Sequence, residues 1–189
     1  MSPDWRDYSY LANGSLRQQA AYETLNGLRI GAVLRAYSPV LAGTIPLGVD
    51  VDESDLDIIC EAHDVTAFAR RLKRAFHHYP DFAIKKTEVD GLPTVIARFT
   101  SGDFVVEVFG QPRPVREQHA FRHMLVEARL LVMGGPSSAD AVRKLKRQGL
   151  KTEPAFAQVF ALEGDPYRAL LLLADLDDHG LRAALKRAL

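Results

Sequence analysis

The chain has 189 residues, 47% of them hydrophobic and 25% charged, and its 24 basic residues balance its 24 acidic ones. This composition is ordinary for a globular protein with a buried core, and the zero net charge excludes a global electrostatic field that would attract long nucleic acid or an anionic membrane. A single cysteine, Cys60, excludes an intrachain disulfide and a multi-cysteine zinc site. The first residues lack a signal-peptide pattern and no apolar run could span a bilayer, so we expect a cytoplasmic protein with no membrane partner.

The first 110 residues predict a mixed α/β region. Ser15 and Asp64 are good helix caps, and Phe68, Leu72 and Phe76 recur every four residues after Asp64. Asp90-Gly91 is typical of a tight hairpin turn between two strands. The expected elements are helices over 15–26, 28–37 and 65–78, and strands over 39–42, 55–60, 82–89, 93–100 and 104–109.

The remaining residues, 111–189, predict helices only. The first is expected over 115–133, with a core-facing stripe of apolar residues (Phe121, Leu125, Ala128 and Val132). The expected fold class is therefore α/β (α+β): a small mixed sheet flanked by helices, with a C-terminal helical bundle. We expect residues 1–110 to form the α/β core and residues 111–189 a helical region packed on it, as a second domain or as part of a single one.

Two aspartates in one strand are the first chemical signal. In Asp55-Leu56-Asp57-Ile58 the carboxylates are two residues apart, so a strand would place them on one face and the apolar residues on the other. Two such carboxylates repel each other when partly buried, and a hard divalent cation removes that cost. Asp55 and Asp57 are therefore candidate Mg²⁺ (or Mn²⁺) ligands. The alternative is a solvated acidic strand edge.

A third acid, Glu107, lies in the middle of the apolar strand expected over 104–109. An ionised glutamate is costly there unless it binds a metal or pairs with Lys or Arg. If this strand lies beside 55–60, Glu107 joins Asp55 and Asp57 as a metal ligand and catalytic acid. A structural ion pair is the alternative.

Gly43-Thr44 precedes Asp55 by a loop of ten residues. The glycine permits close approach of the backbone to a phosphate, and Thr44 offers an N–H and a hydroxyl to an anionic oxygen. Metal-bound carboxylates and a phosphate-binding loop are what phosphoryl and nucleotidyl transfer require.

The spacing from Gly43-Thr44 to Asp55-Leu56-Asp57-Ile58 and then to Glu107 resembles the signature of the DNA polymerase beta-type nucleotidyltransferase superfamily. More of the chain resembles a bacterial family known only as a domain of unknown function. The segments that carry this second resemblance are 43–48, 53–60, 118–123 and 151–156. The superfamily resemblance implies that Thr44 contacts a nucleotide triphosphate, that Asp55 and Asp57 bind metal, and that Glu107 is the third acid. Thr stands where Ser is commoner, and Glu where Asp is commoner.

Three residues of the helical region are further candidates for binding nucleotide or acceptor. Arg122 and, beside it, His123 are expected to face the cleft, and Lys151 comes just before a helix. The alternatives are hydrogen-bonded or solvated side chains for His119 and His123, and a capping role for Lys151.

The sequence therefore predicts a metal-dependent nucleotidyltransferase that moves a nucleoside monophosphate from an NTP to an acceptor hydroxyl of unknown identity. One alternative is a nucleotide-binding or interaction module with weak turnover, such as one member of a paired stress system. The other is a metal-dependent phosphohydrolase or nuclease that uses the same carboxylates. The balanced charge argues against long nucleic acid as a partner.

Overall fold

The computed structural model describes residues 5–188 and divides the chain into two compact units. The first, which we call the sheet unit, comprises the chain up to Pro46 together with Ser54–Gln118. The second, which we call the helical unit, comprises Leu47–Glu53 together with the chain from His119 onward. Each unit has its own apolar core, and each is described by itself.

The sheet unit is built on one five-stranded sheet with the strand order β1-β2-β5-β4-β3. The β2 and β5 strands are parallel, and every other neighbouring pair is antiparallel. The sheet is therefore mixed, as the sequence predicts, and its two acid-bearing strands are direct neighbours. The strands are β1 (Val40–Ala42), β2 (Leu56–Glu61), β3 (Ala83–Val89), β4 (Leu92–Ser101) and β5 (Phe104–Gln111).

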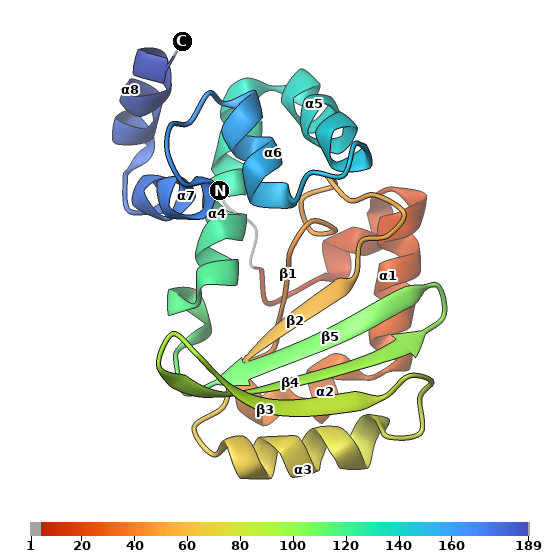
Figure 1. The fold of residues 1–189 in the computed structure, drawn as a ribbon. Helices are drawn as coiled ribbons and strands as arrows, with labels where there is room; N and C mark the ends of the chain where they lie inside the picture. Colours follow the sequence, from red (N-terminus) through yellow and green to blue (C-terminus); the bar gives the residue numbers. More distant parts are fainter. Residues whose placement is uncertain (1–4, 189) are drawn as a thin grey trace. The chain divides into compact units, whose positions relative to one another are not determined.

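The core of the sheet unit lies on one face of the sheet, along which α3 runs (Figure 1). Phe68, Leu72 and Phe76 of α3 are fully buried there, which confirms the four-residue periodicity. Gly110 of β5 lies directly under the ring of Phe68, where any Cβ would collide with it. The helices of this unit are η1 (Ser9–Asn13), α1 (Leu16–Gly27), α2 (Ile30–Val33), η2 (Arg35–Tyr37), α3 (Val65–Phe76) and η3 (Val115–Glu117).

Local signals in this unit are confirmed by the backbone. Ser15 caps α1 in a reciprocal capping box with Gln18, and Asp64 accepts hydrogen bonds from the first N–H groups of α3. Asp90 and Gly91 both have positive φ, as a two-residue hairpin turn requires. Cys60 is buried, and burial raises the pKa of its thiol, so it is a core residue.

Two boundaries differ from the prediction. The helix expected over 28–37 is two short pieces, α2 and η2, because Leu34 between them leaves helical geometry, and the left-handed Arg29 and Ser38 bound the pair. Asp55 precedes β2, which begins at Leu56. The two aspartates therefore do not share a regular strand.

In its described residues the helical unit contains five helices and the connector segment Leu47–Glu53. Its core joins Val49 of the connector to residues of all five helices, such as Leu130, Phe156 and Leu170. The helices are α4 (His119–Gly134), α5 (Pro136–Arg147), α6 (Thr152–Val159), α7 (Pro166–Ala174) and α8 (Asp178–Ala188).

The prediction for α4 was wrong in its start and in its buried face. Residues 115–117 form the separate η3 turn, because Gln118 is extended and α4 begins only at His119. The predicted core stripe is not the buried one, since Val132 is 82% exposed. The residues of α4 that are buried are His123, Met124, Val126, Glu127 and Leu130. Two polar side chains thus turn inward, where a hydrophobic pattern would not place them.

The division between the units falls after Gln118. Its side chain, buried in the sheet unit, donates hydrogen bonds to the carbonyls of Cys60 and Arg113. The amino-acid composition changes near residue 111, but these bonds hold the residues from 112 to 118 to the sheet. In the part of the chain that is described, no helix has the length and apolar character to cross a membrane.

Candidate functional site

Asp57 and Glu107 lie side by side on neighbouring parallel strands. The strand register pairs their Cα atoms, and both residues point away from the face that packs against α3. Their neighbours Leu56, Ile58 and Val106 fill the core on the opposite face. The alternation of the two strands therefore brings together two of the three predicted acids.

Asp55 completes the acidic group from the residue just before β2. Burial raises the pKa of the half-buried Glu107 carboxyl, and the charge of Asp55 raises it further, while Arg98 opposes the shift. Asp55 and Glu107 are therefore close enough to repel each other. A bound cation would relieve that repulsion.

Gly43 is fitted closely against Asp57. Its φ of +80° lies in the left-handed region, and a Cβ at this position would come within 2.5 Å of Asp57 Oδ2. A side chain here would both strain the backbone and displace the carboxylate. Gly43 is predicted to let a phosphate approach the backbone. Its missing side chain also leaves room for the carboxylate of Asp57, a predicted metal ligand.

Thr44 is almost fully buried, at 8% exposure. Its hydroxyl donates a hydrogen bond of 3.3 Å to Ser54 Oγ, and Arg17 donates one of 2.9 Å to the carbonyl of Ser54. These contacts bring the residue after Gly43 and the residue before Asp55 together. The two ends of the connecting loop therefore meet in the sheet unit.

Arg98 is a charged residue of this face that the sequence reading did not select. The register of β4 against β5 pairs it with Glu107, and its side chain is exposed. Strand alternation could have found it, because Val95, Ala97 and Phe99 of β4 are buried on the opposite face. The row Asp57, Glu107, Arg98 runs directly across three strands.

Two of the three candidates from the helical region, Arg122 and His123, have partners inside the helical unit. Arg122 donates to Asp175 Oδ1 at 2.5 Å and to the carbonyl of Leu171 at 3.2 Å. His123 is buried, with Nε2 3.0 Å from the carbonyl of Tyr167 and Nδ1 3.4 Å from Glu153 Oε1. The exposed Lys151 precedes α6 without a side-chain capping bond. Nucleotide binding by Arg122, His123 and Lys151 stays a prediction.

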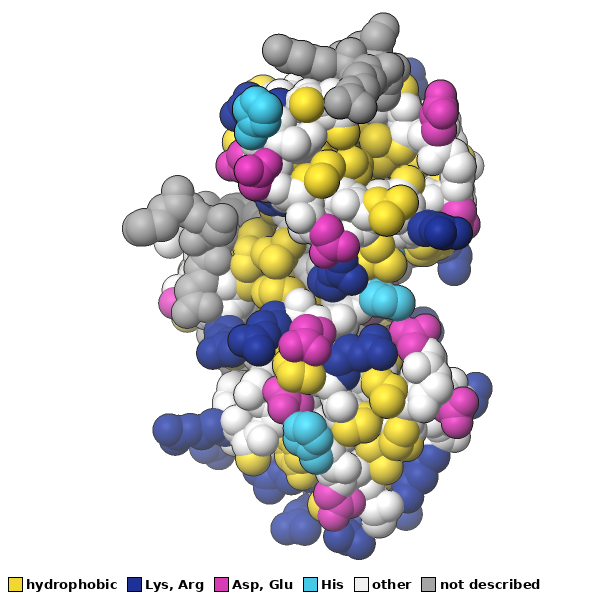
Figure 2. Space-filling view, turned by 90° about the vertical axis from the view of Figure 1, so that its left-hand side faces the viewer, with side chains coloured by type: hydrophobic (Ala, Val, Ile, Leu, Met, Phe, Trp, Pro, Cys, Tyr) yellow, Lys and Arg dark blue, Asp and Glu magenta, His cyan; other side chains and the backbone are white. Residues whose placement is uncertain are grey.

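A basic surface on the sheet unit lies apart from these acids. The exposed cations of α3 are Arg70, Lys73 and Arg74, and Lys86 of β3 reaches Thr66 of the same helix at 3.3 Å. Dark-blue side chains gather at the lower margin of Figure 2, at the height of α3 in Figure 1. Because α3 covers the face opposite Asp57 and Glu107, these cations do not neutralise the acids.

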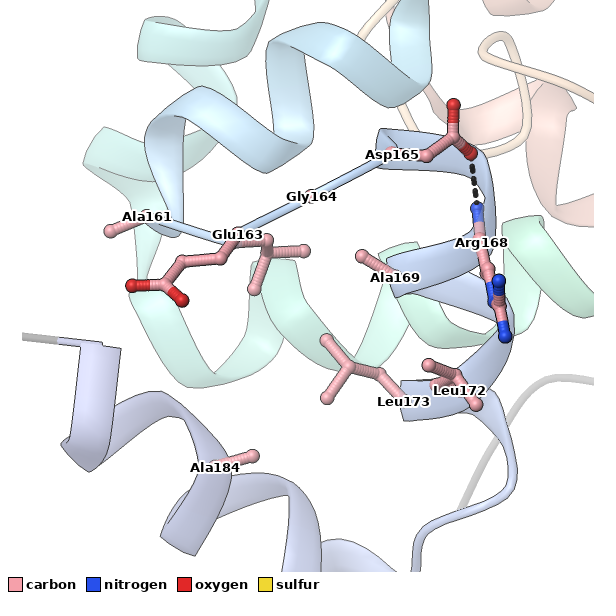
Figure 3. A pocket seen from close by; sticks show the side chains of 10 residues that line it. Ala161, Glu163, Gly164, Asp165, Arg168, Ala169, Leu172, Leu173 and Ala184 are labelled. Carbon is pink, nitrogen blue, oxygen red and sulfur yellow. Dashed lines mark hydrogen bonds between the residues drawn. The ribbon is translucent and has the colours of Figure 1, made fainter.

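Two hollows lie in the helical unit and contain none of the predicted site residues. One, of about 570 Å³, lies between the α6–α7 loop, α7 and α8, and Figure 3 shows its mainly apolar lining. Asp165 there accepts a hydrogen bond from the backbone N–H of Arg168 and so caps α7. The other, of about 620 Å³, is lined by residues such as Met133, Phe160 and Arg182. Neither resembles a site for a metal-bound triphosphate.

The acidic face suits a hard cation by its donor type. Carboxylate oxygens are preferred Mg²⁺ ligands, and Mg²⁺ is commonly held by one or two carboxylates together with substrate phosphates. Within residues 5–188, no three His, Cys, Asp or Glu side chains are already gathered as a finished metal site. The carboxylates therefore fit a metal site in which the phosphates of a nucleotide supply the remaining ligands.

Comparison with known proteins agrees with this architecture. Residues 23–173 match the model of a family described as Domain of unknown function (DUF4269). No curated protein matches the sequence.

Three solved structures align with most of this chain at low sequence identity. The Cid1 poly(U) polymerase with Mg 3'-dATP bound aligns with a TM-score of 0.56 and 13% identity over 82% of this chain and 52% of that one. A cytoplasmic RNA terminal U-transferase gives 0.55 and 13%, over 82% and 52%. The GLD-2/RNP-8 complex gives 0.51 and 12%, over 81% and 57%. The chain thus has a nucleotidyltransferase fold and spans about half the length of these proteins.

Proposed function

We propose that this chain, which belongs to the family described as Domain of unknown function (DUF4269), is a metal-dependent nucleotidyltransferase. It moves a nucleoside monophosphate from an NTP to an acceptor hydroxyl. The proposal assigns Asp55, Asp57 and Glu107 to Mg²⁺ or Mn²⁺, and Gly43 and Thr44 to the triphosphate.

The observation that carries the proposal is the contact set around Asp57. Its strand neighbour in register is Glu107, and the left-handed Gly43 lies against its carboxylate. An acidic pair held beside a glycine turn is a poor way to stabilise a sheet, because like charges are brought together at partial burial. It is a suitable arrangement for binding a cation and a phosphate at one point.

The chain's own groups would act on the acceptor and on the triphosphate. A carboxylate of the site accepts the proton of the acceptor hydroxyl as its oxygen bonds to the α-phosphorus. The bond between the α-phosphorus and its bridging oxygen breaks, and pyrophosphate leaves. The Thr44 N–H and the turn at Gly43 hold the phosphates in line. A bound divalent metal would supply positive charge to the attacking and leaving oxygens.

The residues of the sheet unit do not identify the acceptor. The solved neighbours are named as poly(U) polymerase and RNA terminal U-transferase, and they are about twice as long as this chain. We therefore propose the transfer chemistry and leave the acceptor as any hydroxyl compound that an unbiased labelling experiment identifies.

The test is metal-dependent NTP binding and transfer. Wild-type protein, Asp55→Asn and Asp57→Asn are titrated with each NTP in the presence of Mg²⁺ or Mn²⁺. We expect the variants to lose about a hundredfold or more in affinity for the metal–nucleotide complex, because a ligand is removed. Asp103→Asn is the matched control, since Asp103 is an exposed acid in the turn between β4 and β5. Equal binding by wild type and Asp57→Asn would contradict the site assignment.

The products separate the proposal from its alternatives. Transfer releases pyrophosphate and labels an acceptor when cell extract is added with an NTP labelled at the α-phosphate. Release of orthophosphate or cleavage of nucleic acid without an acceptor would indicate a phosphohydrolase or nuclease. Tight binding with no released pyrophosphate would indicate a nucleotide-binding module.

A further inference from the structure

The loop that joins the two halves of the candidate site belongs to the helical unit. Thr44 and Asp55 are both in the sheet unit, but Leu47–Glu53 between them packs with the helices. We call Leu47–Glu53 the connector. None of its residues belongs to a strand of the sheet. Something outside the sheet must therefore fix its path.

The connector is anchored first by apolar burial. Val49 is fully buried and belongs to the same core cluster as Val126 of α4 and Val142 of α5. Leu47 packs against that cluster as well. Two of its seven residues thus insert into the helical core.

Two cations of α5 then hold the connector's backbone. Arg143 donates a hydrogen bond to the carbonyl of Gly48, and Lys146 donates one of 3.1 Å to the carbonyl of Val49. Residues three apart lie on one face of a helix, so α5 presents both donors together to two successive carbonyls. Gly48 has a φ of +65°, which marks a turn at the first anchored carbonyl.

A carboxyl group orients Arg143, and another lies near Lys146. Arg143 Nη2 lies 2.5 Å from Asp140 Oδ1, one turn earlier on the same helix. Lys146 lies near the buried carboxyl of Glu127, on α4. A charged donor held in place makes a stronger hydrogen bond than a mobile surface lysine, because less side-chain freedom is lost when it binds.

We propose that Arg143 and Lys146 are positioning residues for the nucleotide, and that α5 clamps the connector so that Thr44 and Asp55 are held together for binding. The proposal rests on the proposed function of that site. A loop that moves freely lowers the fraction of molecules in the binding-competent arrangement, and the apparent affinity falls by the same factor. The clamp gives the helical unit a role in nucleotide binding through the connector.

The experiment compares the double variant Arg143→Ala/Lys146→Ala with wild type. Circular dichroism and thermal melting first establish that the variant is folded. We expect its affinity for the Mg²⁺–NTP complex to fall about tenfold, and KM for NTP to rise with little change in kcat. Lys144→Ala is the matched control, because Lys144 is an exposed cation of the same helix. Arg143→Lys and Lys146→Arg keep a donor at each position and should recover most of the affinity.

Hydrogen exchange gives a readout that does not depend on nucleotide. We expect the amides of 48–55 to exchange faster in the double variant and at the wild-type rate in Lys144→Ala. If the double variant fails to fold, the single variant Lys146→Ala is measured in the same way.

The outcomes separate the clamp from the function. Wild-type affinity and unchanged exchange in a folded double variant would overturn the clamp and leave the nucleotidyltransferase proposal intact. Absence of NTP binding by the wild type would overturn the proposed function and, with it, the role of the clamp in nucleotide binding.

Discussion

The two units each contain a glutamate away from bulk water, and the surroundings of these residues differ. Glu107 in the sheet unit is half-buried beside Asp55 and Asp57, so like charges are brought together. Glu127 in the helical unit is 2% exposed, and around it charges of both signs are present, with Glu153 and Lys146 nearby. Both neighbouring aspartates of Glu107 carry its own sign of charge, whereas Glu127 has one acid and one cation nearby.

The ion pairs of the helical unit support this contrast. Arg122 pairs with Asp175, Arg129 with Asp178, Arg143 with Asp140, and His123 lies beside Glu153. Arg143–Asp140 lies within α5, while the other three contacts join α4 to residues of other helices or their caps; exposed pairs of this kind contribute modestly to stability. The contrast is what we expect if the chemistry resides in the sheet unit and the charges of the helical unit act through its structure. Variants of the acids in the sheet unit should therefore change NTP binding, whereas variants of helical ion pairs that do not hold the connector should change stability alone.

The largest expected effect comes from Gly43→Ala. The Cβ would strain a left-handed backbone, which costs about 1–2 kcal/mol of stability, and would displace the Asp57 carboxylate. We expect NTP binding in the presence of Mg²⁺ to fall by about a hundredfold, as for loss of a metal ligand. Isothermal titration and a denaturant melt measure the two effects.

A matched glycine separates strain from displacement. Gly91 has a similar φ of +72°, and no atom lies within 4 Å of a Cβ built there. Gly91→Ala should therefore lose similar stability and keep full NTP affinity. Equal affinities in the two variants would show that Gly43 does not position Asp57.

The next effect is on the pH dependence of stability. Burial raises the pKa of Glu127 to about 8, and the charge of Glu153 adds to the shift, while Lys146 opposes it. In the unfolded chain the pKa of this carboxyl is near its ordinary value of 4.5. Between these values the unfolded state binds fewer protons, so the free energy of unfolding falls as the pH rises from about 4.5 to about 8. The loss is on the order of 5 kcal/mol.

Glu127→Gln removes the titrating group and keeps its shape. We expect the variant to melt at a higher temperature than wild type at pH 8 and to show a flatter stability profile across this window. Glu163→Gln, an exposed glutamate of the same unit, is the control and should follow the wild-type profile. A wild-type profile in Glu127→Gln would mean that Glu127 is ionised in the folded protein.

The sequence predicts the sheet unit better than the helical unit, for physical reasons. Strand alternation and the four-residue spacing on α3 report burial directly, because the side chains of that core are apolar. On α4 the same rule fails, since the buried His123 and Glu127 take positions that a hydrophobic pattern assigns to the surface. His123 is held by Tyr167 and Glu153 of other helices, and the burial of Glu127 raises the pKa of its carboxyl. Neither environment is visible in a local pattern.

The residues of the candidate site also differ in how well the sequence predicts them. Asp57 and Glu107 could be placed on one face because strand periodicity is strict, and β4 alternation would have added Arg98. The path of the connector could not be predicted, because it depends on Val49 and on two cations of α5 nearly a hundred residues later. Arg122 and His123 looked available from sequence, and their contacts in the structure are with other helices.

The smallest effect is expected for the pair Arg122–Asp175, whose variants test directly whether this arginine is structural. Arg122→Ala removes the ion pair and a hydrogen bond to Leu171, and we expect a loss of about 1 kcal/mol; Asp175→Asn should lose about 0.5 kcal/mol, because Asp175 is largely exposed. Both variants should retain NTP affinity if the arginine only joins α4 to α7. Weaker NTP binding in Arg122→Ala but not in Asp175→Asn would instead assign Arg122 to the nucleotide and would end the division between a chemical sheet unit and a structural helical unit.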